Sequence, residues 1–226
     1  MKQDINKIVT LFICFFFFSS IHLFAQSKPF EAEIIAFAKS DSIVPPLPGK
    51  IVFAGSSSFT KWKDINQYFP GYSIINRGFG GANLLDLTQY VQETILKYKP
   101  KQVVIYCGEN DLASSDTVTA EMVLSRFANL YKIIRNELGK KTKISFVSIK
   151  PSISRWHLET KIVAANQLIS NFITHQANSN FINIHNAMLQ TDGSVMKDIF
   201  ITDNLHMNAK GYAIWQKIIF PTLLVD

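Results

Sequence analysis

The feature that most constrains the fold is an alternation of short apolar runs with segments of helical periodicity. The apolar runs are rich in β-branched and aromatic residues, and they predict strands over 50–54, 72–76, 102–107, 144–149 and 181–184. Apolar residues spaced three and four apart predict helices over 28–40, 84–95, 123–138, 156–176 and from about 208 onward. This alternation is typical of an α/β protein, so we expect a three-layer sandwich with a mostly parallel five-stranded sheet.

Polar or glycine-rich clusters follow the first three of these strands. Three serines occupy 56–58, a glycine-rich turn covers 78–81, and Glu-Asn-Asp occupies 109–111. Right-handed crossovers bring the carboxyl ends of parallel strands to one edge of a sheet, so we expect the three clusters to lie together. A buried strand that delivers hydroxyl groups to this edge is well placed to present a nucleophile. The other interpretation of 56–58 is a serine-rich turn that caps a helix.

A base for such a nucleophile is available near the carboxyl end of the chain, at His206. Asp203 precedes it by three residues on a predicted turn, so its carboxylate can reach Nδ1 and leave Nε2 pointing outward. This is the arrangement of base and orienting carboxylate in a hydrolytic triad. In the alternative interpretation, Asp203 caps the terminal helix and His206 is a surface residue.

Four sequence blocks together resemble the SGNH (GDSL-type) hydrolases over nearly all of the mature chain. They are 53–58, 76–81, 108–111 and the Asp-x-x-His of 203–206, in the order that this family has. The first block departs from the usual Gly-Asp-Ser, because Ser56 stands where the family has aspartate. We interpret this as a subfamily variant, although it leaves Ser56 and Ser58 as rival nucleophiles. The resemblance implies the flavodoxin-like SGNH fold.

The resemblance also implies roles for particular residues. Matched by position, they are the nucleophile Ser57, the base His206, its orienting Asp203, and the oxyanion donors Ser57, Gly81 and Asn110. A glycine amide can approach a ligand closely, and a neutral asparagine amide can donate to an oxyanion. Arg155 and Trp156 follow the fourth strand near the same edge, and we expect them to contact substrate. The alternative for them is a loop and helix start with a packed tryptophan.

The implied activity is that of a serine esterase acting through an acyl-enzyme without a cofactor. The expected substrate is an O-acyl ester, an acetyl ester on a carbohydrate in the first instance. Three alternatives stay open, namely a lysophospholipase or thioesterase, an acyl transferase, and a noncatalytic binding module on the same fold. Retention of all the triad and oxyanion positions argues against the last of these.

Several other classes of function have little support in the sequence. No His, Cys and Asp residues have the spacing of a metal site, and no phosphate-binding P-loop is present. The net charge is +6, but the lysines are scattered, so a nucleic-acid partner is not expected. Cys107 ends an apolar run, and we expect it to be a buried packing residue.

The first 25 residues resemble a secretory signal peptide. Lys2 and Lys7 precede the apolar block 8–24, and Ala25-Gln26-Ser27 offers a cleavage site. We therefore predict an exported protein, periplasmic or secreted, with no stable membrane span after cleavage. An N-terminal helix and linker would cover 26–49 and the hydrolase domain 50–226. The alternative is an uncleaved leader that anchors the protein in the membrane.

Overall fold

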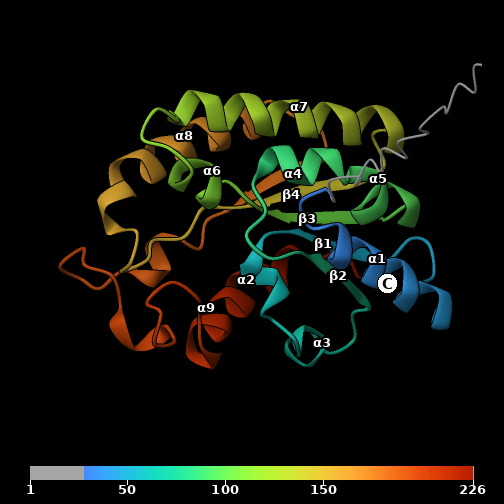
Figure 1. Cartoon of the computed structure of the whole chain (residues 1–226), viewed down its shortest axis with the longest axis horizontal. Helices are drawn as coiled ribbons and strands as arrows, with labels where there is room; N and C mark the ends of the chain where they lie inside the picture. Colours follow the sequence, from blue (N-terminus) through green and yellow to red (C-terminus); the bar gives the residue numbers. More distant parts are fainter. Residues whose placement is uncertain (1–27, 226) are drawn as a thin grey trace, which may run out of the picture.

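The computed structural model describes residues 28–225, in which a central sheet lies between two layers of helices (Figure 1). The sheet has the order β2-β1-β3-β4-β5, and every neighbouring pair is parallel. The strands are β1 (Ile51–Gly55), β2 (Ile74–Gly78), β3 (Gln102–Tyr106), β4 (Lys143–Val147) and β5 (Ser179–Ile182). The predicted α/β sandwich is thus confirmed, and the sheet is wholly parallel.

Helices cover both faces of the sheet and enclose two separate apolar cores. One face carries α4 (Leu84–Gln89), α5 (Val91–Thr94), α7 (Ala120–Leu138) and α8 (Glu159–Thr174). The other face carries α2 (Ser57–Thr60), α3 (Ile65–Tyr68) and α9 (Ala209–Ile219). Because both faces are covered, every residue of β1 and β3 is buried, which explains their nearly continuous apolar sequences.

The remaining helical elements are short, apart from α1. They are α1 (Glu31–Ile43), α6 (Glu109–Ala113), η1 (Leu96–Tyr98), η2 (Trp156–Leu158), η3 (Asn186–Met188), η4 (Lys197–Ile199) and η5 (Phe220–Thr222). No helix within residues 28–225 is long and apolar enough to cross a lipid bilayer. The predicted leader, residues 1–25, lies outside the described part of the chain.

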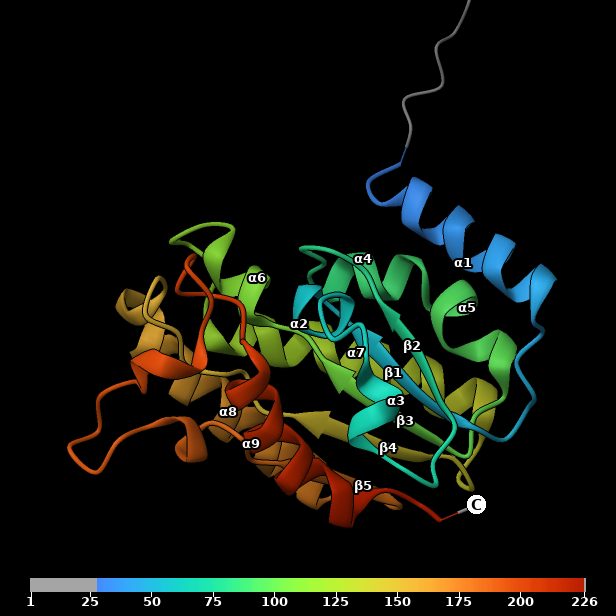
Figure 2. The same cartoon turned by 90° about the horizontal axis from the view of Figure 1, so that it is seen from below.

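Helix α1 lies beyond the β2 edge of the sheet, beside α5 (Figure 2). Only Ile34 of this helix is buried, and Ile35 is 60% exposed, so its apolar face is narrow. Polar contacts attach it instead. Asp41 pairs with Arg77 at the end of β2 and accepts a hydrogen bond of 2.7 Å from the Tyr98 hydroxyl.

Two strands begin and end two residues away from their predicted positions. Strand β2 runs on to Gly78, because a glycine there lets the strand pass against α2; a Cβ at this position would lie 2.6 Å from Phe59 Cβ. Strand β5 begins at the polar Ser179, because it is the edge strand and the Asn180 side chain accepts a hydrogen bond from Ser145. Asparagine is depleted in strands, so the apolar pattern places the start of this strand at 181 instead.

Two predicted helices have different limits in the structure. The segment 84–95 is divided into α4 and α5, and the break falls at Tyr90. The segment 156–176 begins as the 3₁₀ turn η2 before α8. Asn83 caps the start of α4, since its side chain accepts hydrogen bonds from the amides of Leu85 and Asp86.

Candidate active site

The turn between β1 and α2 presents one of the three serines at the sheet edge. Gly55 has φ +149°, and a Cβ there would lie 1.9 Å from the Tyr106 carbonyl oxygen, so the turn requires glycine. Ser56 and Ser58 are only 2% and 1% exposed, whereas Ser57 is partly exposed. Of the three serines, Ser57 is therefore the one that is accessible at the surface.

The structure brings Ser57, His206 and Asp203 into one hydrogen-bonded chain. Nε2 of His206 lies 2.9 Å from Ser57 Oγ, and Nδ1 lies 2.6 Å from Asp203 Oδ2. The amides of Leu205 and His206 donate to Asp203 Oδ1 at 2.9 and 2.8 Å and fix the carboxylate. Because a carboxylate only accepts, Nδ1 carries the proton, and Nε2 is free to receive one from the serine hydroxyl.

The charge on Asp203 is stabilised by its hydrogen bonds. Burial is the largest single influence and raises the pKa of Asp203, but the donors from His206 and Leu205 together outweigh it and lower the pKa to about 2. The carboxylate is therefore ionised at any pH at which the protein is expected to work. An ionised Asp203 can stabilise the imidazolium that forms when His206 takes a proton.

The glycine-rich loop after β2 lies against the serine turn. The Phe79 amide donates to the Gly55 carbonyl at 3.0 Å, and Gly81 has φ +74°, a left-handed conformation suited to glycine. Within residues 28–225, the amides of Ser57 and Gly81 have no hydrogen-bond acceptor. Two unpaired backbone donors, one in the serine turn and one in the loop that packs against it, are suited to holding an oxyanion.

Asn110 joins this loop from α6. Gly108, with φ +114°, turns the chain after β3, and Asn110 lies in the first turn of α6. Its Nδ2 donates to the carbonyl of Ala82, next to Gly81, at 3.1 Å. The structure thus brings all the predicted oxyanion donors to the edge that carries Ser57.

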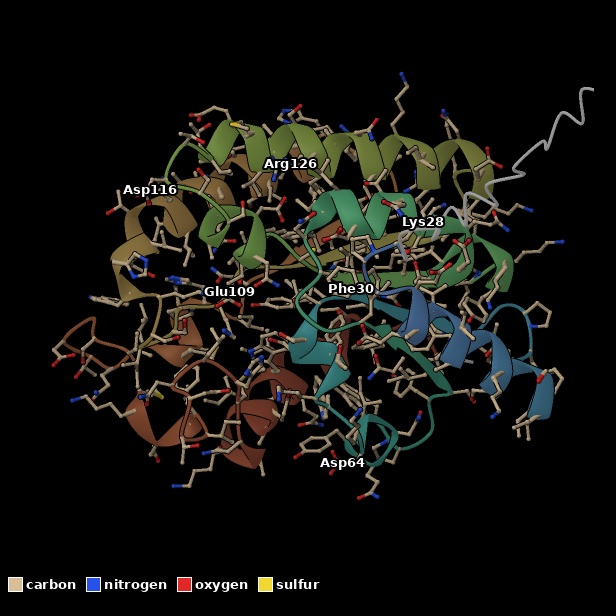
Figure 3. The ribbon with its side chains drawn as sticks, in the orientation of Figure 1. Lys28, Phe30, Asp64, Glu109, Asp116 and Arg126 are labelled. Atoms are coloured by element: carbon tan, nitrogen blue, oxygen red, sulfur yellow. The ribbon has the colours of Figure 1, made fainter. Side chains whose placement is uncertain are left out.

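Asp111, the last residue of the same block, makes contacts that indicate a structural role. Its carboxylate is completely buried and accepts hydrogen bonds from the Leu84 amide at 2.9 Å and from Arg126 at 2.8 Å. Burial raises the pKa of Asp111, and Arg126 opposes this rise. The carboxylate ties the start of α4 to α7, whose Arg126 is labelled in Figure 3.

A buried charge cluster that the sequence analysis missed lies beneath Asn110. Glu109, labelled in Figure 3, accepts hydrogen bonds from Lys150 at 2.8 and 2.9 Å and from the Tyr106 hydroxyl at 2.8 Å. Lys150 is completely buried and Glu109 is 4% exposed. The signal available in the sequence was a pair of oppositely charged residues, each within three positions of the end of a buried strand.

The ionisation of this cluster depends on its internal pairing. Burial raises the pKa of Glu109, but Lys150 and Arg155 lower it by more, so the carboxylate is ionised. Burial lowers the pKa of Lys150, and Glu109 opposes that change. Each charge is therefore stabilised in the interior by the other.

Arg155 and Trp156 adjoin in the chain, but their side chains have different surroundings. Arg155 Nη1 donates to Asn110 Oδ1 at 2.9 Å, so its guanidinium lies at the site. Trp156 begins the 3₁₀ turn η2, as the alternative of a loop and helix start expects, but its side chain is 42% exposed and so is not the packed tryptophan of that alternative. The expected contact of either residue with substrate stays a prediction.

Other reactive residues lie apart from this site. His185 is buried beside Glu159, in keeping with a structural role. Cys107 is completely buried, as predicted, and burial raises the pKa of its thiol well above the usual range. In the part of the chain that the structure describes, no group of three or more His, Cys, Asp or Glu side chains could hold a metal ion.

Comparisons with known proteins place the chain among similar sequences and folds. The sequence profile of the GDSL-like lipase/acylhydrolase family matches residues 41–214. A GDSL-like lipase from Bacteroides thetaiotaomicron superposes with a TM-score of 0.70 at 19% identity, covering 84% of this chain and 97% of that one. A comparison with curated protein sequences gave no match.

Two esterases share the fold at lower identity. A catalytic mutant of an acetylxylan esterase from Geobacillus stearothermophilus has a TM-score of 0.62 at 13% identity, covering 77% of this chain and 94% of that one. An acetyl esterase mutant solved with an acetate ion has a TM-score of 0.59 at 16% identity, covering 77% and 95%. At these identities the likeness shows a common fold.

Proposed function

Because the chain belongs to the GDSL-like lipase/acylhydrolase family, we propose that it is an exported serine esterase that removes an O-acetyl group from a carbohydrate. The observation that carries the proposal is the chain of contacts from Asp203 through His206 to Ser57, at 2.6 and 2.9 Å. These distances lie within the hydrogen-bond reach that a base and its nucleophile need. Ser57 is also the one serine of its turn that is not buried.

The first half of the reaction forms an acyl-enzyme. Ser57 Oγ attacks the ester carbonyl carbon while Nε2 of His206 takes the hydroxyl proton. The carbonyl electron pair moves onto oxygen, and the amides of Ser57 and Gly81 with Nδ2 of Asn110 hold the resulting oxyanion. When the intermediate collapses, the bond to the alcohol breaks, and His206 delivers its proton to the leaving oxygen.

Hydrolysis of the acyl-enzyme repeats these steps with water. His206 takes a proton from the water molecule, whose oxygen attacks the acyl carbon and forms a second oxyanion. Collapse of this intermediate breaks the bond to Ser57 Oγ, which recovers the proton from His206. The carboxylic acid leaves, and the triad returns to its starting state. No step requires a group that residues 28–225 and water do not supply.

The substrate class is proposed from the relatives. An acetylxylan esterase and an acetyl esterase share the fold, and both act on acetyl esters, as their names state. Export, proposed from the leader-like residues 1–25, would bring such an enzyme to carbohydrates outside the cytoplasm.

Cell fractionation, with the intact mass of the recovered protein, tests whether the protein is exported. A full-length chain left in the cytoplasmic fraction would refute export.

Labelling with a serine-directed fluorophosphonate tests the mechanism directly. We expect one adduct on the wild-type protein, at Ser57, and none on Ser57→Ala. Ser56→Ala is the matched control, because it alters the buried neighbouring serine and should leave labelling intact. Absence of any adduct on folded wild-type protein would favour a noncatalytic binding module and refute the proposal.

A chain-length panel of p-nitrophenyl esters, followed by acetylated oligosaccharides, tests the substrate. We expect kcat/KM to be highest for the acetyl ester and to fall as the acyl chain lengthens, with release of acetate from the oligosaccharide. A maximum at long acyl chains or at a thioester would identify a different acyl specificity. Transfer of the acetyl group to an added alcohol in preference to water would identify a transferase.

A further inference from the structure

The side-chain amide of Asn110 is held at both of its ends. Its Oδ1 accepts a hydrogen bond of 2.9 Å from Arg155 Nη1, and its Nδ2 donates one of 3.1 Å to the Ala82 carbonyl. A guanidinium donates only, so the amide oxygen has to face Arg155, and the NH₂ group has to face the glycine loop. One of the two hydrogens on Nδ2 is used by Ala82, which leaves the other for an oxyanion.

Arg155 is itself fixed by the buried charge cluster. Its Nη1 lies 3.7 Å from Oε1 of Glu109, and Glu109 is held in turn by Lys150 at 2.8 Å. The Arg155 side chain is 20% exposed, so its charge is only partly screened by water. The segment that carries Arg155 is also bound to the loop that carries the base, because the Ser154 amide donates to the Asn204 carbonyl at 3.1 Å.

We propose that Arg155 is a positioning residue of the oxyanion hole, acting through Asn110. It fixes the orientation of the amide, and its positive charge at Oδ1 polarises the amide so that the free Nδ2 hydrogen is a stronger donor. This inference rests on the proposed esterase function. It goes beyond the four sequence blocks, none of which contains Arg155.

The proposal predicts where the kinetic effect of a substitution appears. An oxyanion exists only in the transition state and the intermediate, so a weaker donor should lower kcat and leave KM nearly unchanged. For Arg155→Gln acting on a neutral acetyl ester, we expect kcat to fall about 10- to 100-fold. This is less than the roughly 10²–10³-fold cost of deleting a donor outright. Arg155→Lys should recover part of the loss, because a lysine keeps the charge without the planar fork.

A double-mutant cycle separates action through Asn110 from independent action. If Arg155 acts through the amide, Arg155→Gln should cost little more in an Asn110→Ala background, where there is no amide to orient. Added guanidinium ion, at a concentration that leaves the fold intact, should raise the kcat of Arg155→Ala. It should not raise the kcat of the variant that combines Arg155→Ala with Asn110→Ala. An equal concentration of sodium chloride controls for ionic strength.

A structural explanation of the same loss is tested with a second arginine. Arg135 donates to the carbonyls of Gly139 and Thr142, at the amino-terminal side of β4 and away from Ser57. Arg135→Gln should lower the melting temperature and leave the kcat of the folded enzyme unchanged. Each variant is therefore compared per active site, counted by fluorophosphonate titration.

Two outcomes would overturn the inference while the esterase function stands. One is a rise in KM with kcat preserved, which would mean that Arg155 binds substrate directly. The other is an Arg155→Gln factor in the Asn110→Ala background equal to that in the wild type, which would mean independent action. A folded wild-type protein that neither labels nor hydrolyses any ester would instead overturn the proposed function, and the inference with it.

Discussion

Lys150 and Glu109, 41 residues apart in the chain, form an ion pair of 2.8 Å with both side chains buried. Glu109 follows β3 and Lys150 follows β4, so the pair joins two neighbouring strand ends. The segment after β3 carries Asn110, and the segment after β4 carries Arg155. The ion pair therefore sets the relative position of the oxyanion donor and the arginine that contacts it.

Removing one partner of this pair should strongly destabilise the protein. Lys150→Met leaves Glu109 with a buried charge and less compensation, so we expect the free energy of unfolding to fall by about 3–5 kcal/mol. Urea unfolding followed by circular dichroism measures the change. The double variant with Glu109→Gln should recover part of the loss. The matched control is Lys210→Met, since Lys210 pairs with Asp198 on the exposed surface and its loss should hardly move the midpoint.

Removing the charge of Asp203 should slow catalysis without unfolding the site. In Asp203→Asn the remaining oxygen can still accept the backbone amides, but the NH₂ group disfavours the tautomer that puts a proton on Nδ1. We expect kcat for an acetyl ester to fall on the order of 10²–10⁴-fold. A variant with kcat close to that of the wild type would contradict the role proposed for Asp203.

Titration of the same carboxylate should not affect kcat/KM over the working pH range. The pKa of Asp203 is about 2, which is below its value in the unfolded chain, so it is protonated only as the pH falls toward 2. Between pH 4 and 9, kcat/KM should therefore show no inflection from Asp203. Rates recorded across this range test the expectation, and an inflection that Asp203→Asn abolishes would contradict it.

The pair of His185 and Glu159 should make stability depend on pH. Nε2 of His185 lies 2.8 Å from Glu159 Oε1; burial lowers the pKa of His185, but Glu159 outweighs burial and raises it above 6.5. A raised folded-state pKa means that the pair stabilises the fold below about pH 6.5, and that this contribution is lost as the pH rises through that pKa. Melting temperatures at pH 6 and 8.5 measure it. Glu159→Gln should flatten the difference, and an unchanged difference would refute this explanation.

Helix α1 should support the glycine loop through Glu33. Its Oε1 accepts a hydrogen bond of 2.8 Å from the amide of Gly80, the residue before Gly81. Glu33→Ala should therefore lower kcat, by less than the roughly 10²-fold cost of losing an oxyanion donor. Glu33→Gln keeps an acceptor and should retain most of the activity. Glu31→Ala is the control, since Glu31 is exposed on the same helix, and equal losses in both alanine variants would argue against a specific contact.

The sequence was sufficient for the fold because its strongest patterns are local. The runs in β1 and β3 are apolar apart from Gln102, since helices cover both faces of these strands, and the Asn83 cap and the end of α7 at Gly139 follow from residue chemistry. The limits of β2 and β5 were harder to predict. They depend on contacts with α2 and with β4 that no local pattern contains.

The residues of the candidate site could be predicted from the sequence, but the contacts that hold them in place could not. Serine, glycine, asparagine and Asp-x-x-His stand at strand ends or in the final loop, where a parallel sheet brings them together. The bond from Glu33 to Gly80 spans 47 residues, and that from Lys150 to Glu109 spans 41. Contacts of this range depend on how elements pack, and a charged residue after a strand looks the same in sequence whether it is buried or exposed.

The distance along the chain between Ser57 and His206 has a consequence for folding. The two residues are 149 positions apart, and α9 is fastened to the serine turn by a hydrogen bond of 2.9 Å from the Tyr212 hydroxyl to the Ser58 carbonyl. Contacts of such long range are costly in loop entropy and slow to form. During refolding, the sheet can assemble before the C-terminal segment docks. Recovery of ester hydrolysis should therefore lag behind recovery of secondary structure. The time at which activity returns would then report when the C-terminal segment docks.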